Sequence, residues 1–165
     1  KRLVFMKTID NFIEDKLIFE NIKNTILGKD FTWTYSDEVG SPLDDSGILF
    51  CHQMYFTHEG QKSPLFKLMH PIIGRLKFNE ILRIKVNGYP KTHKPIKHQF
   101  HRDFPIPHKV ALFSLNTNNG GTEFRDKTFS NSVENRLLMF DGALEHRSVT
   151  QTDENFRVNV NINYI

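Results

Sequence analysis

The segment HQFHRDFPIPHK, residues 98–109, holds three histidines, one aspartate and two prolines. Within it, His101 and Asp103 are two positions apart, and in an extended chain such residues project to the same side. An imidazole nitrogen and a carboxylate oxygen on one side could occupy two adjacent positions around one metal ion. A single His-x-Asp triplet is common in surface loops, so this pair indicates a metal site only together with further ligands.

His146 is the candidate for a third ligand. It follows a strand-like segment, RLLMF, and an Asp-Gly turn. Two imidazoles and one carboxylate are the set that binds non-haem Fe(II) and leaves other coordination positions open. The alternative is a histidine at the rim of the fold. His98 lies three residues before His101 and so points to the other side of an extended chain; His98 and His108 are expected at the surface.

The segment FRVNVNINY, residues 156–164, alternates between apolar and polar side chains, as a strand does. An arginine and three asparagines on one face are costly to bury without partners. This face therefore either borders a polar ligand inside a barrel or faces water. Its members are Arg157, Asn159, Asn161 and Asn163.

In order and spacing, His101, Asp103, His146 and Arg157 resemble the motif of the 2-oxoglutarate- and Fe(II)-dependent dioxygenases. The segment LNTNNGGTEF, residues 115–124, is similar to the strand, glycine turn and strand between the metal-ligand strands of prolyl-hydroxylase-like members. The resemblance covers residues 82–165.

The resemblance implies an α+β, mainly β fold: a double-stranded β-helix, or cupin-like jelly roll, with N-terminal helices bracing one sheet. It implies that His101, Asp103 and His146 hold iron, and that the guanidinium of Arg157 binds the 5-carboxylate of 2-oxoglutarate. O₂ would be the other cosubstrate, succinate and CO₂ the co-products, and ascorbate a candidate reductant. The expected reaction is hydroxylation of an unidentified substrate.

Asn87 and Tyr89, in KVNGYP, resemble an Asn-x-Tyr motif of the nucleic-acid demethylase branch, where such residues contact the cosubstrate. The spacing from Tyr89 to His101 is longer than in that branch, and the last strand lacks that branch's second arginine. The alternative is a strand end followed by a turn. Asn159, on the same strand face as Arg157, is a further candidate for contact with 2-oxoglutarate.

The substrate class stays open at this point. A protein or peptide side chain is the first choice, because GGTEF resembles the prolyl-hydroxylase-like branch; a nucleic-acid base or a small molecule are the alternatives. A non-catalytic metal-binding jelly-roll module and a zinc hydrolase are the competing functions. Basic residues surround the motif and either recruit a partner or are simply solvated: Lys91, Lys94, Lys97, Arg102 and Lys109.

A chain of 165 residues suits one domain. We expect residues 1–78 to support a jelly-roll core formed by residues 79–165. A single cysteine excludes an intramolecular disulfide and fits a reducing compartment, so a cytoplasmic location is expected. No apolar run approaches the length of about 20 residues that a membrane span needs. The net charge of +3 is mild and predicts neither a nucleic-acid partner nor an oligomeric state.

Hydrophobic periodicity and turn signals place the secondary structure. One helix is expected from Phe12 to Ile26, capped by Asp10 or Asn11, and a second from Pro64 to Ile73, kinked or split at Pro71. Short strands separated by turns favour a sandwich or barrel. The expected strands are 3–10, 31–35, 47–58, 80–89, 109–117, 122–126, 136–141, 146–151 and 156–165.

Overall fold

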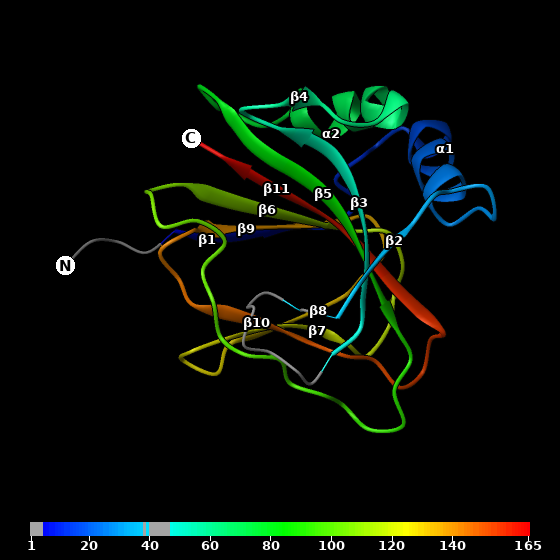
Figure 1. The fold of residues 1–165 in the computed structure, drawn as a ribbon, viewed down its shortest axis with the longest axis vertical. Helices are drawn as coiled ribbons and strands as arrows, with labels where there is room; N and C mark the ends of the chain where they lie inside the picture. The colour runs from blue at the N-terminus through cyan, green and yellow to red at the C-terminus, as the bar shows by residue number, and fades with distance from the viewer. Residues whose placement is uncertain (1–4, 38, 40–46) are drawn as a thin grey trace.

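The computed structural model describes residues 5–37, 39 and 47–165, and the statements below concern these residues. Figure 1 shows the helices gathered over one side of a large sheet, with a small sheet on the other side. In chain order the elements are β1 (Met6–Ile9), α1 (Lys16–Ile26), β2 (Thr34–Ser36), β3 (Leu49–Phe56), β4 (Gly60–Gln61), the 3-10 helix η1 (Pro64–Met69), α2 (His70–Ile73), β5 (Ile81–Pro90), β6 (Lys109–Ser114), β7 (Gly121–Phe124), β8 (Phe129–Asn131), β9 (Arg136–Asp141), β10 (His146–Val149) and β11 (Phe156–Tyr164).

Two antiparallel sheets make a jelly roll, as expected. The large sheet has the order β1-β9-β6-β11-β5-β3-β2, with β4 paired to β3, and the small sheet has the order β10-β7-β8. Strands from the N-terminal half extend the large sheet at both edges, because β1 pairs with β9 and β3 with β5. The expected mainly β architecture, with helices on one sheet, is confirmed.

Successive side chains of the large sheet point to opposite faces, so the sheet packs in two separate layers. On the helix side of the large sheet, Val160 and Phe113 are fully buried in the main apolar cluster, which also contains Phe19 of α1. The rings of Phe19 and Phe113 meet edge to face at 6.1 Å. On the other side, a smaller cluster that includes Leu112 and Phe140 faces the small sheet. The rest of that inner face, on β11 and β5, carries the polar residues described below.

The start of α1 differs from the prediction. The cap is Asp15, whose Oδ1 accepts hydrogen bonds from the backbone N–H groups of Leu17 at 2.9 Å and Ile18 at 3.2 Å. Asn11 does not cap the helix, because it lies four residues before this cap with a φ of 50°. The two buried residues that follow it, Phe12 and Ile13, donate their backbone N–H groups to Asn135 instead. Leu17, expected on the apolar face, is 82% exposed.

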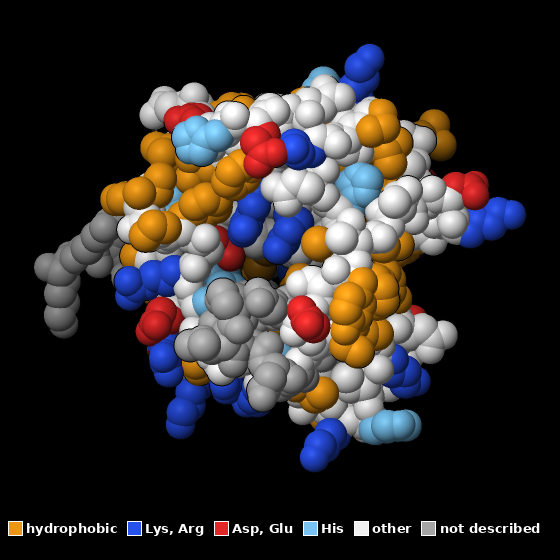
Figure 2. Space-filling view, in the orientation of Figure 1, with side chains coloured by type: hydrophobic (Ala, Val, Ile, Leu, Met, Phe, Trp, Pro, Cys, Tyr) orange, Lys and Arg blue, Asp and Glu red, His pale blue; other side chains and the backbone are white. Residues whose placement is uncertain are grey.

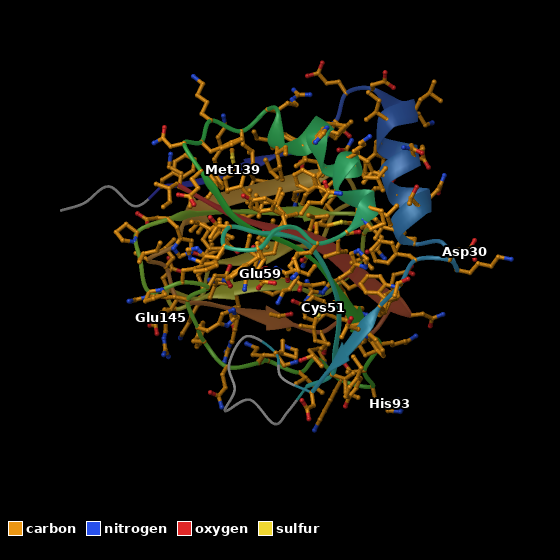
Figure 3. The ribbon with its side chains drawn as sticks, turned by 45° about the horizontal axis from the view of Figure 1, so that its top comes forward. Asp30, Cys51, Glu59, His93, Met139 and Glu145 are labelled. Carbon is orange, nitrogen blue, oxygen red and sulfur yellow. The ribbon has the colours of Figure 1, made fainter. Side chains whose placement is uncertain are left out.

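Replacement of Asp15 by alanine tests this cap. Two N–H groups of the first turn would lose their acceptor, so the free energy of unfolding should fall by about 1 kcal/mol. Chemical denaturation measures the change. Asp30→Ala is the matched control, since Figure 3 shows Asp30 at the outer edge of the molecule, and that variant should be neutral. Equal losses in the two variants would contradict the assignment of the cap.

The second helical segment is split, as predicted. A 3-10 helix from Pro64 to Met69 is capped by Ser63, whose Oγ accepts from Leu65 N at 3.1 Å, and α2 then begins at His70 with Pro71 in its first turn. Proline at this place loses no helical hydrogen bond. Within the described part of the chain, every helix is too short or too polar to cross a membrane.

The predicted strands of residues 80–165 all form, and the structure adds β8. This three-residue strand lies at the edge of the small sheet, where Gly121 of β7 pairs with Asn131. Gly121 suits this close approach, because a Cβ there would lie 2.2 Å from the carbonyl oxygen of Ser130. The glycine turn seen in the sequence therefore leads into a tight hairpin of the small sheet.

Candidate metal centre

His101, Asp103 and His146 come together between the two sheets. One ligand atom from each lies within 4.8 Å of the other two. Asp103 Oδ1 is 3.6 Å from His101 Nε2 and 4.0 Å from His146 Nε2. Metal bonds to nitrogen and oxygen of about 2.0–2.2 Å let one ion touch donors up to about 4.4 Å apart. The cluster therefore suits one ion after small side-chain movements.

The two histidines are joined through their backbones. His101 and His146 form an isolated antiparallel bridge, with N···O distances of 3.0 and 3.1 Å, and their rings are 4.7 Å apart. His146 opens β10, whereas Asp103 lies in a bend after the bridge. His101 and Asp103 therefore do not lie on a regular strand, because pairing stops at His101, yet both side chains reach the cluster.

Backbone carbonyls orient both imidazoles. His101 Nδ1 is 3.2 Å from the carbonyl oxygen of Gln99, and His146 Nδ1 is 3.1 Å from that of Leu144. A carbonyl oxygen only accepts, so Nδ1 carries the proton and Nε2 keeps its lone pair toward Asp103. Burial lowers the pKa of His146, against the opposing charge of Asp103, and so favours the neutral form that binds metals.

Asp103 is fixed by the large sheet. Its Oδ2 accepts hydrogen bonds from Asn161 Nδ2 at 3.0 Å and from Asn163 Nδ2 at 2.7 Å, both on β11. Arg83 Nη2, on β5, is 3.4 Å from Oδ1. The carboxylate is thus tied to one sheet while Oδ1 faces the histidines.

The environment keeps this carboxylate ionised. Burial alone would raise the pKa of Asp103, but the facing imidazoles of His101 and His146, the guanidinium of Arg83 and a hydrogen bond from Asn163 hold it well below its usual value. The cluster therefore presents two imidazole nitrogens and one anionic oxygen, which is the donor set that Fe(II) accepts.

Arg157 lies near the other end of the polar face of β11. Only 2% of its surface is exposed. Its guanidinium lies 4.1 Å from the centre of the Tyr89 ring, and Nη2 donates a hydrogen bond to Ser148 Oγ on β10. Arg157 Nε is buried without a hydrogen-bond partner among the described residues. A buried guanidinium with an unused N–H group is suited to an anionic ligand.

The polar face of β11 points into the protein, so the water-facing alternative is wrong. Asn159, Asn161 and Asn163 are at most 6% exposed. Asn159 Oδ1 accepts from Asn87 Nδ2 at 3.2 Å, and Asn87 Oδ1 has no hydrogen-bond partner in the described structure. Asn87, Tyr89 and Asn159, all predicted to contact a cosubstrate, thus lie beside Arg157 on the same inner surface.

Tyr89 supplies a neutral hydroxyl at this place. Burial raises the pKa of its phenol, and the opposing effects of Arg157 and of hydrogen bonds with Ser148 and Asn159 do not reverse this shift. Ser148 was not singled out in the sequence. The only signal for it was its place two residues after His146 on a short strand, which puts both side chains on one face.

The prediction of surface positions for His98 and His108 is wrong. They are 1% and 6% exposed. His98 Nδ1 is 3.1 Å from the carbonyl oxygen of Ser148, and His108 packs on Gly142, where a Cβ would lie 2.3 Å from the ring. The three-residue spacing assigns His98 to the side of the chain opposite to His101. It does not predict exposure, because other parts of the protein cover both sides of this segment.

Two of the five basic residues around the motif contact other side chains of the protein. Lys97 Nζ is 2.8 Å from Glu123 Oε1, and Lys109 Nζ lies 5.9 Å from the centre of the Tyr164 ring. The ammonium group of Lys97 is therefore paired within the protein, while its side chain stays 52% exposed.

Comparison with protein-family models found no match, and a search of curated proteins found no similar sequence. Solved structures do match. A viral collagen prolyl hydroxylase, vCPH, from Paramecium bursaria Chlorella virus-1 has a TM-score of 0.62 at 13% identity, covering 98% of this chain and 97% of that one. A 2OG-Fe(II) oxygenase family oxidoreductase from Burkholderia pseudomallei has a TM-score of 0.65 at 12% identity, with coverages of 98% and 84%. A prolyl-4-hydroxylase from Pseudomonas putida has a TM-score of 0.62 at 12% identity, with coverages of 98% and 92%.

The chain has the 2-oxoglutarate–Fe(II) oxygenase fold. Identities this low establish the fold alone, so any statement about chemistry has to come from the site. In this oxygenase fold, the His-Asp-His cluster and the buried arginine occupy one inner surface between the two sheets.

Proposed function

We propose that this chain is an Fe(II)- and 2-oxoglutarate-dependent hydroxylase. One observation carries the proposal: a convergent His-Asp-His cluster and a buried arginine with an unused N–H group lie along the same polar strand face. A metal-binding module without catalysis would need the first feature but not the second. A zinc hydrolase would also have no use for Arg157.

The residues present fit both groups. Two imidazoles and an ionised carboxylate suit Fe(II) and would leave open positions. A keto acid lying along β11 would place its far carboxylate at Arg157, where a planar fork binds two oxygens. Tyr89 offers a hydroxyl, and Asn87 and Asn159 offer amides, beside the same path.

When bound, iron and 2-oxoglutarate supply oxidative chemistry that consumes O₂, yields succinate and CO₂, and hydroxylates the substrate. The protein's own residues bind the metal and orient its ligands. His101, Asp103 and His146 would bind the metal, and Asn161 and Asn163 fix the carboxylate. The two sheets limit access of water, since the inner face of β11 is buried.

The proposed substrate is a protein or peptide side chain. Similarity in fold to two structures described as prolyl hydroxylases supports this choice, together with the tight β7–β8 hairpin that follows the predicted glycine turn. A nucleic-acid substrate receives no comparable support, because the net charge is only +3.

An anaerobic titration tests the proposal. Fe(II) and 2-oxoglutarate together should give a weak visible charge-transfer band, which neither gives alone, since the band arises from chelation of the metal by the keto acid. Succinate formation in air without added substrate should accompany it. Failure of the band to appear would reject the proposed function.

Asn163→Ala tests the support of the metal ligand. It removes the shorter of the two β11 hydrogen bonds to Asp103, so Fe(II) affinity should fall about 10–100-fold. The affinity is measured by anaerobic titration. Asn131→Ala, on the exposed edge strand β8, is the control and should bind as the unmodified protein does. Unchanged affinity in Asn163→Ala would show that β11 does not orient the ligand.

A further inference from the structure

Lys85 belongs to the inner row of β5. Arg83 contacts Asp103, and Asn87 contacts the polar face of β11, so both residues two positions away from Lys85 face the interior. Residues i and i+2 of a strand share a face, and Lys85 therefore faces the same space. On the neighbouring strand β11, Lys85 pairs with Asn161, which is one of the two asparagines that donate hydrogen bonds to Asp103.

The described residues offer the ammonium group of Lys85 no partner. Within the described residues it neither donates a hydrogen bond nor joins an ion pair. Burial lowers the pKa of Lys85, and the neighbouring charge of Arg83 acts in the same direction, whereas Cys51 and Asp103 act weakly against them. Figure 2 shows Lys and Arg side chains gathered in the hollow at the centre of one face of the molecule.

The sum of charges around the metal cluster indicates that an anion is missing near Lys85. A ferrous ion and 2-oxoglutarate carry equal and opposite charges, so together they leave the site unchanged. Among the described residues, Asp103 then offsets only one of three cations that face the interior, which are Arg83, Lys85 and Arg157. A net positive charge therefore remains. Uncompensated charge in a partly buried space is unfavourable. Arg83 contacts Asp103 and Arg157 is assigned to one carboxylate of the keto acid, so Lys85 is the one of the three cations without a direct anionic contact among the described residues.

Two acceptors flank the same place. Asn161 Oδ1 and Asn87 Oδ1 are buried and have no hydrogen-bond partner among the described residues. Asn161 lies opposite Lys85 on β11, and Asn87 follows Lys85 by two residues on β5. A ligand with an anionic group and a neighbouring N–H or O–H would satisfy Lys85 and these acceptors together.

We propose that Lys85 binds a carboxylate of the substrate beside the metal cluster. The inference rests on the proposed function and narrows it: the substrate is acidic, either a free carboxylic acid or a peptide with an Asp or Glu side chain next to the hydroxylated position. Lys85 acts as a positioning cation, and its compact ammonium can follow a carboxylate that approaches through the open hollow.

Lys85→Met tests this, because methionine keeps a long unbranched side chain without the charge. Lys67→Met, at an exposed site on η1, is the control. Affinity for 2-oxoglutarate is read from the charge-transfer band. Stimulated succinate formation is then compared for probes that differ only in carboxylate against amide: Glu- and Asp-containing peptides against their Gln and Asn counterparts, and free acids against their amides.

The unmodified protein and Lys67→Met should prefer the acid in at least one pair by about tenfold or more, as for one partly buried ion pair. Lys85→Met should lose that preference and keep its affinity for 2-oxoglutarate within about twofold. The pair that responds identifies the source of the carboxylate, peptide or free acid.

Three results would overturn the inference and leave the proposed function standing. Weaker binding of 2-oxoglutarate by Lys85→Met would make Lys85 a cosubstrate ligand. An acid preference that survives in Lys85→Met, or no preference in the unmodified protein, would remove the carboxylate subsite while leaving the band and the proposed function intact. Absence of the band in the unmodified protein would instead reject the proposed function, and this inference with it.

Discussion

Asp103→Ala is expected to abolish the Fe(II)- and 2-oxoglutarate-dependent absorption band. The variant loses the only anionic donor of the cluster, and the two histidines cannot replace it. Loss of groups that merely support a ligand costs about 10–100-fold in metal affinity, so loss of the ligand itself should exceed about a hundredfold. Anaerobic titration with Fe(II) measures the affinity directly.

Folding has to be separated from metal binding in this variant. Arg83, Asn161 and Asn163 lose an acceptor when Asp103 is removed, and a circular dichroism melt will show whether the fold persists. Asp30→Ala, at an exposed position, is the matched control and should give the full band. A folded Asp103→Ala protein that still gives the band would remove Asp103 from the ligand set.

Arg157→Met is expected to weaken binding of 2-oxoglutarate while leaving Fe(II) affinity unchanged. Removing one partner of a buried charge pair costs about 2–5 kcal/mol, which corresponds to an increase in Kd of about 30- to 4,000-fold. Arg157→Lys should fall in between, since it keeps the charge but loses the fork that binds two oxygens. Titration of the band with 2-oxoglutarate at saturating Fe(II) gives the Kd.

Arg125→Met controls for the loss of an arginine, because Arg125 is an exposed residue paired with Glu145. It should bind 2-oxoglutarate as the unmodified protein does. An unchanged Kd in Arg157→Met would place the keto acid elsewhere and reject the assignment of the polar face of β11 as its path.

Local alternation predicted short strands, a sandwich or barrel, and the two faces of β11, whereas the jelly roll was implied by the family resemblance. Residues 156–164 separate apolar from polar side chains without exception, so the strand and its two faces could be read directly. The glycine turn at 120–121 marked the boundary between two strands, but β8, the second strand of the hairpin that follows, was not predicted. The resemblance then grouped His101, Asp103, His146 and Arg157, which the structure places along one inner surface.

The features that were missed depend on contacts between distant segments. The late start of α1 follows from the anchoring of residues 12 and 13 to Asn135, more than one hundred residues away, together with the cap at Asp15. Burial of His98 depends on β10, with which it bonds through Ser148. Neither relation leaves a periodic signal in the sequence.

Arg83 and Lys85 were missed for a different reason. In ILRIKVNGY they read as the solvent side of an alternating strand. Only the pairing of β5 with β11 shows that this side faces the cluster, because Asn161 and Asn163, which hold Asp103, lie opposite these two residues. Cationic residues of a strand can therefore belong to a site when both sheets of a jelly roll cover them.

The central claim is that one ferrous ion binds His101, Asp103 and His146 together. Anomalous diffraction at the iron edge, from crystals grown without oxygen in the presence of Fe(II) and 2-oxoglutarate, tests it most directly. We predict a single iron peak bounded by the Nε2 atoms of both histidines and a carboxylate oxygen of Asp103, with a carboxylate of the keto acid on Arg157. Iron bound at other residues, or no iron in crystals of the folded protein, would contradict the account.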